Sequence, residues 1–80
     1  MNKHLLNAVI DVVTFFANCD DDACDPDAAV RMLESIAWHM QQLTATQRSK
    51  FIEHCQELAA AAEDPEASEF LLQIPTNLGL

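Results

Sequence analysis

The stretch "DPDAAVRMLESIAWHMQQLTATQ", residues 25–47, contains two helix starts and the whole of one helix. Asp25 is a favourable N-cap, Pro26 fits the first helical position because it lacks an N–H, and Asp27 favours the helix dipole. The segment "TATQ" has the spacing of a capping box, in which Thr44 and Gln47 satisfy each other's backbone amides. We therefore expect one helix that ends near residue 43 and another that begins at Thr44.

The N-terminal segment, from about residue 4 to residue 17, has the apolar spacing of a helix with a wide apolar arc. At 100° per residue, one face collects most of its apolar side chains: Leu5, Leu6, Val9, Val12, Val13 and Phe16. Ile10 and Phe15 flank this face, and only a narrow strip is polar: Asn7, Asp11, Thr14 and Asn18. An arc this wide predicts burial on more than one side, either by the other helices or by an oligomer contact.

A fourth helix is predicted near the C-terminus, because "DPE" repeats the start signal "DPD" of the second helix. Asp64 would cap this helix, with proline in its first position. We expect it to be short and to end near Ile74, since Pro75 disfavours helical backbone at the residue before it. The tail that follows retains two leucines, which we expect to fold back on the core: Leu78 and Leu80.

The composition agrees with a helical chain. Half of the 80 residues are apolar and only one is glycine, which favours helix and disfavours sheet. Short connections make neighbouring helices antiparallel. We predict an all-α fold with one domain over residues 1–80, a small antiparallel bundle of three longer helices and a short C-terminal helix.

The charge of the chain is strongly negative, since thirteen acids face four bases for a formal net charge of −9. Such a charge repels nucleic acid and anionic membranes and attracts basic partners. In an up-down bundle the first and third connections share one end, which would gather nine acids into one pole: Asp20, Asp21, Asp22, Asp25, Asp27, Glu63, Asp64, Glu66 and Glu69. The other four acids balance the four bases, so this predicted acidic pole holds the whole net charge.

Helix capping explains only some of these acids. It accounts for the acids of "DPD" and "DPE", but not for the aspartate run (Asp20, Asp21 and Asp22), which precedes the cap. Like charges crowded together destabilise a fold, so the run predicts either a contribution to solubility or recognition of a basic surface.

Trp38 is a further candidate for binding. It lies about 140° from Leu33 on the second helix, among polar neighbours such as Arg31 and Glu34. Tryptophan and arginine are the residue types most enriched in binding hot spots. The alternative is that the tail or the fourth helix covers Trp38.

The stretch "NCDDDACDPD", residues 18–27, invites metal-binding interpretations that its spacing does not support. An EF-hand loop starting at Asp20 would need glycine and glutamate where Asp25 and Arg31 stand. Cys19 and Cys24 form a C-x4-C pair, but no second paired spacing supplies the other two ligands of a zinc site. Because no catalytic motif is present either, we predict no metal, no cofactor and no enzymatic activity.

The first nineteen residues resemble a secretion signal in outline. Asn7 and Asp11 interrupt the apolar run, which is also too short to span a bilayer. We therefore expect a cytoplasmic protein whose three cysteines are free thiols, with a regulatory disulfide between Cys19 and Cys24 as the alternative.

Two segments carry a resemblance to known proteins. "LESIAWHMQQLTATQRSKFIEHCQELA" and "DPEASEFLLQIPTNLGL" resemble short, acidic, helical bacterial proteins that end in an F-x-x-x-[IL]-P-x-x-[LI]-G-L tail. In size, charge and helical content the chain is also similar to small immunity proteins, which neutralise toxic effectors. We therefore predict a binding protein that masks a basic surface such as a nuclease's phosphate-binding cleft, with the acidic pole steering association and Trp38 as an apolar anchor. The alternative is a small homo-oligomeric structural or regulatory protein, a homodimer through the N-terminal helix.

Overall fold

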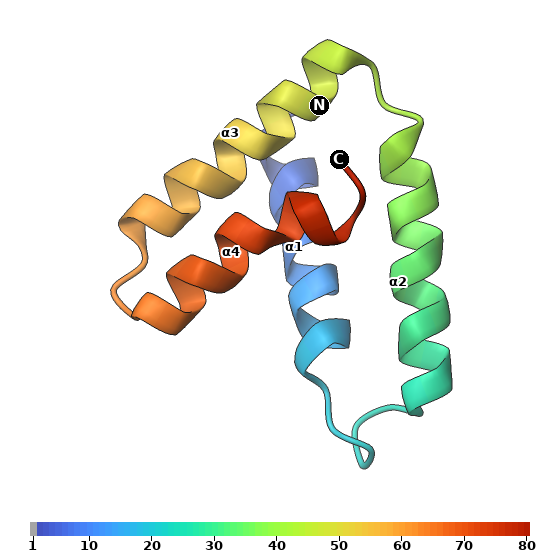
Figure 1. Cartoon of the computed structure of the whole chain (residues 1–80). Helices are drawn as coiled ribbons and strands as arrows, with labels where there is room; N and C mark the ends of the chain where they lie inside the picture. The colour runs from blue at the N-terminus through green and yellow to red at the C-terminus, as the bar shows by residue number, and fades with distance from the viewer. Residues whose placement is uncertain (1) are drawn as a thin grey trace.

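The computed structural model describes residues 2–80, which form four helices: α1 (Lys3–Asn18), α2 (Pro26–Gln41), α3 (Ala45–Ala61) and α4 (Pro65–Asn77). No strand occurs in this range, so the predicted all-α class is confirmed. The helices have 16, 16, 17 and 13 residues, so α4 is only slightly shorter than the others. The α1–α2 pair and the α3–α4 pair are antiparallel hairpins, and α4 crosses in front of α1 (Figure 1).

Side-chain caps hold three of the four helix starts. Oδ1 of Asn2 accepts from the N–H of Leu5 at 2.9 Å. Thr44 closes the predicted capping box of α3 in both directions. Oδ1 of Asp64 accepts from the N–H of Glu66 at 3.1 Å, as predicted for α4. Asp25 is the N-cap residue of α2 and Pro26 follows it in the first turn, as predicted, but the side chain of Asp25 makes no capping bond.

The predicted end of α4 near Ile74 is also wrong, because the helix continues through Pro75 to Asn77. Proline removes one backbone hydrogen bond, but the next turn is closed by the N–H of Leu78, which donates to the carbonyl of Ile74 at 3.0 Å. Just beyond the C-cap Leu78, Gly79 has a φ of 78°, the left-handed conformation that glycine adopts without penalty. The sequence signal for the helix end was therefore this glycine and not the proline.

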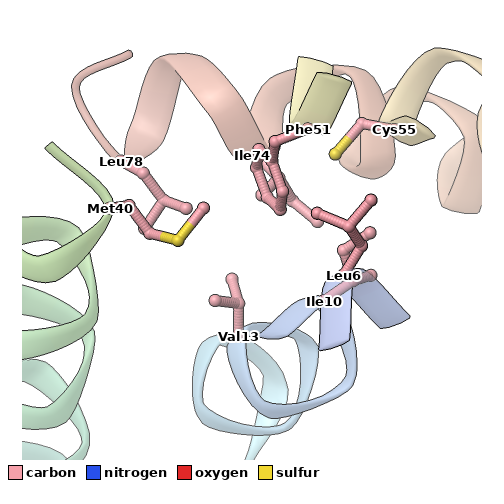
Figure 2. Close-up of a cluster of buried hydrophobic side chains, with 8 residues drawn as sticks. All are labelled: Leu6, Ile10, Val13, Met40, Phe51, Cys55, Ile74 and Leu78. Carbon is pink, nitrogen blue, oxygen red and sulfur yellow. The ribbon is translucent and has the colours of Figure 1, made fainter. Parts of the chain in front are cut away.

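One core joins all four helices. Leu6, Ile10 and Val13 point from α1 toward residues of the other three helices, as Figure 2 shows. The remaining buried members come from α2, α3 and the C-terminal segment: Met40, Phe51, Cys55, Ile74 and Leu78. Leu80 packs against this cluster, so the prediction that the tail folds back on the core is confirmed.

A polar contact connects α1 to α3, between the exposed side chain of Asn7 and the buried ring of His54. His54 is only 8% exposed, and its Nε2 lies 2.6 Å from Oδ1 of Asn7. A buried polar group is costly unless it is hydrogen-bonded, and this contact supplies a partner for the ring of His54. One residue of the polar strip of α1 therefore contacts α3, while its side chain stays exposed to solvent.

Candidate interaction site: an acidic groove between α1 and α4

The two acidic connections do not meet in one pole. Figure 1 shows the connection between α1 and α2 and the connection between α3 and α4 at different corners of the molecule. The prediction assumed four helices running up and down together. The two hairpins cross instead, so their turns point in different directions.

Acids do gather where the start of α4 faces the second half of α1. An open groove of about 660 Å³, here called the acidic groove, lies between these helices. Three carboxylates line it, two from the start of α4 and one from α1: Asp64, Glu66 and Asp11. Its other walls are polar residues of α1 and apolar residues below them: Thr14, Asn18, Ile10, Leu58, Ala67, Phe70 and Leu71.

Local hydrogen bonds explain how these side chains are positioned. Asp64 enters the groove as the cap of α4, and its bond to the amide of Glu66 holds that first turn in place. On α1, Oγ1 of Thr14 donates to the carbonyl of Ile10 at 2.7 Å, and Nδ2 of Asn18 donates to the carbonyl of Thr14 at 2.8 Å. Both side chains are thereby fixed along the groove wall.

Sequence reasoning missed Asp11, which it assigned to the neutral body of the protein. The available signal was the polar strip, because Asp11 shares it with Thr14 and Asn18. In the structure Asp11, Thr14 and Asn18 line the acidic groove opposite α4, and Asp11 and Asn18 are exposed there.

The aspartate run does not line this groove. It begins two residues after Asn18, the last groove residue of α1, and all three aspartates are exposed. Oδ1 of Asp20 accepts from the N–H of Ala23 at 2.8 Å, which is a local turn contact. The other acids of the predicted pole are exposed and lie outside the groove lining: Asp25, Asp27, Glu63 and Glu69.

A disulfide closes the acidic connection between α1 and α2. Cys19 and Cys24 are bonded, with their Cα atoms 6.3 Å apart, so the prediction of free thiols is wrong for these two and the alternative pairing holds. Cys55 is the remaining free thiol; it lies in the core, and burial raises its pKa to about 11. Across residues 2–80, no three His, Cys, Asp or Glu side chains are grouped so that they could hold a metal ion.

Trp38 lies away from the acidic groove. Its side chain is 59% exposed, so neither the tail nor α4 covers it. The ring contacts His39 edge-on, with centroids 5.0 Å apart. It is thirteen positions beyond Asp25, or roughly 20 Å along α2, which separates it from the acids at the start of that helix.

An apolar hollow adjoins the acidic groove. It has a volume of about 240 Å³ and lies between α1, α2 and α4. Phe70 lines both spaces, so the hollow and the groove meet at that ring. The hollow is lined mostly by apolar side chains, with one acid and one amide among them: Val13, Ala17, Val30, Leu33, Glu34, Ala37, Ile74, Asn77 and Leu78.

No protein-family model, curated protein or solved structure matches the chain. Within the part of the chain that the structure describes, no helix has the length and apolar character needed to cross a bilayer.

Proposed function

We propose that this protein is a non-enzymatic binding protein that masks a basic surface of a partner protein. The observation that carries the proposal is the acidic groove, in which Asp11, Asp64 and Glu66 share one open space. Such a groove attracts lysine and arginine side chains, and its field steers a basic partner toward it. An immunity-type or antitoxin-like protein that neutralises a toxic effector is the form of this function that the charge and size favour.

The hydrogen bonds of the two arginines leave the groove's carboxylates available. Nε of Arg31 donates to the backbone carbonyl of Asp27, and the guanidinium of Arg48 donates to the carbonyl of Gln41. Both partners are backbone oxygens at sites outside the groove lining. Neither arginine therefore neutralises Asp11, Asp64 or Glu66, and these carboxylates stay available to a basic partner.

The apolar hollow gives this partner a second contact. Binding interfaces combine a desolvated apolar anchor with a polar rim. Phe70 lines both the hollow and the acidic groove. Trp38 is exposed on α2 and lines neither of them. We therefore assign the anchor to the hollow, filled by an apolar side chain that the partner presents beside its cationic residues.

Calorimetric titration with an arginine-rich peptide containing leucine tests the proposal. The variant Asp11→Asn/Glu66→Gln removes two charges from the groove, and Glu53→Gln/Glu57→Gln removes two from α3 outside it. We expect the groove variant to bind about tenfold more weakly, since each contact is worth on the order of 0.7 kcal/mol. The α3 variant should bind within about twofold of the wild type. Equal losses in both variants would mean that the peptide responds only to net charge.

The compartment in which this masking occurs is a separate part of the proposal. The interrupted apolar run at the N-terminus favours a cytoplasmic protein, whereas the bond between Cys19 and Cys24 is of a kind that persists in oxidising compartments. Cell fractionation with thiol labelling decides between these locations. Cytoplasmic protein with both cysteines reduced would support the first, and oxidised protein outside the cytoplasm would support the second.

A further inference from the structure

The helix α1 is turned so that part of its apolar arc faces solvent. Leu5, Val12 and Phe15 are 54%, 42% and 47% exposed. Its polar strip lies at the flank of its buried face, where Asn7 bonds to His54 and Asp11 lines the acidic groove, and both of these side chains are exposed. A helix covered only by its own chain normally places polar side chains, and not apolar ones, on its solvent side. Contiguous exposed apolar surface of this kind marks an interaction site.

The exposed positions of α1 have the spacing of a helix–helix seam. Leu5, Ala8, Val12 and Phe15 follow one another at intervals of three, four and three residues, and this set is here called the α1 seam. Those intervals are the a/d spacing of a coiled coil. They read the same in both directions, so two antiparallel copies would place Leu5 opposite Phe15 and Ala8 opposite Val12.

The surface beside the seam is shaped to receive a second helix. Ala8, Val9 and Val12 form a shallow hollow together with Ile36 of α2. Met32 lies one turn before Ile36 on the same side of α2 and is 45% exposed, so it extends this apolar surface. The small side chain of Ala8 leaves room for the larger residue that an antiparallel copy would bring opposite it.

The charges at the ends of α1 complement those of an antiparallel copy. The first turn of α1 contains no acid and its last turn contains no base, so its own side chains do not compensate the helix dipole. The aspartate run follows the C-terminal end. In an antiparallel pair, the run of each copy lies near the positive N-terminal end of the other, where α1 begins with Lys3.

We propose that the α1 seam binds the α1 seam of a second copy in an antiparallel, two-fold arrangement, with the axis midway between Ala8 and Val12. A surface that is self-complementary in this way is what a two-fold dimer requires. The seam and the acidic groove lie on different faces of α1, so this dimer does not depend on the masking function proposed above.

Sedimentation velocity across protein concentration tests the dimer with a matched pair of variants. Val12→Glu places a carboxylate in the seam, and Leu72→Glu makes the same change at a residue of α4 that is 52% exposed. We expect the wild type and Leu72→Glu to dimerise alike. Val12→Glu should raise the dissociation constant by at least about a hundredfold, because each dimer would bury two unpaired charges. Circular dichroism should show equal helix content in all three proteins.

A monomeric wild type throughout the concentration range would overturn the proposal, as would equal weakening in both variants. The direction of pairing is tested by mixing Leu5→Cys and Phe15→Cys chains that carry different isotope labels, under mild oxidation. Antiparallel pairing predicts disulfides between the two kinds of chain. Disulfides formed mainly within each kind would show parallel pairing and contradict the arrangement.

Discussion

The helices α2 and α4 begin with the same signal, an aspartate followed by proline and a second acid, yet the two starts differ in structure. At α4, Asp64 accepts a hydrogen bond from Glu66, and both side chains line the acidic groove. At α2, the side chain of Asp25 makes no capping bond, and a disulfide closes the preceding connection. The start of α4 is therefore stabilised by a side-chain hydrogen bond, whereas the start of α2 follows a connection that a disulfide closes.

This difference separates acids that build the fold from acids that do not. Asp64 has a structural role as well as a place in the groove. In the aspartate run, Asp20 supports a turn, while Asp21 and Asp22 are exposed. The following predictions test this difference in order of decreasing effect.

Removing the disulfide should have the largest effect. We expect Cys19→Ser/Cys24→Ser to lower the free energy of unfolding by about 2 kcal/mol, the chain-entropy value for so short a loop. Urea unfolding followed by circular dichroism measures this change. In reducing buffer, the wild type should have the same free energy of unfolding as the variant. A variant as stable as the oxidised wild type would show that the disulfide does not stabilise the start of α2.

Changing the two caps should have a smaller and unequal effect. Asp64→Ala should lower the free energy of unfolding by about 1 kcal/mol, because it leaves an amide of the first turn of α4 without its partner. Asp25→Ala should change it by less than about 0.5 kcal/mol, since that side chain makes no capping bond. Equal losses in the same urea experiment would mean that the two starts are capped alike.

Neutralising the aspartate run should have the smallest effect and the opposite sign. Asp21→Asn/Asp22→Asn should raise the free energy of unfolding by a few tenths of a kcal/mol at low salt, by relieving repulsion between like charges. The gain should disappear in about 1 M salt, where screening is strong. As a control, Glu53→Gln/Glu57→Gln should give no gain, because Lys3 and Lys50 lie on the same surface as these two glutamates.

Local sequence signals predicted most of the helices, because the contacts that start a helix join residues only a few positions apart. The box of Thr44 and Gln47, the cap at Asp64 and the return of Leu78 to the core were all readable from the sequence. Pro75 misled the prediction, since the turn after it is closed by other backbone bonds and ends at Gly79.

The site could be predicted only in part, because it depends on how the two hairpins cross. The acids of "DPE" were identified as candidates, but their meeting with Asp11 required the position of α4 over α1. The packing of α1 against α3 includes a contact between Asn7 and His54, which are far apart in the sequence. No local pattern shows which face of a broadly apolar helix will be left exposed.

The most direct test of the central claim is a nuclear magnetic resonance titration of isotope-labelled protein with the arginine-rich peptide used above. The claim predicts the largest shifts at backbone amides along the acidic groove, including those of Asp11, Thr14, Asn18 and Glu66. Shifts confined to the aspartate run, or spread equally over Glu53 and Glu57 on α3, would contradict it.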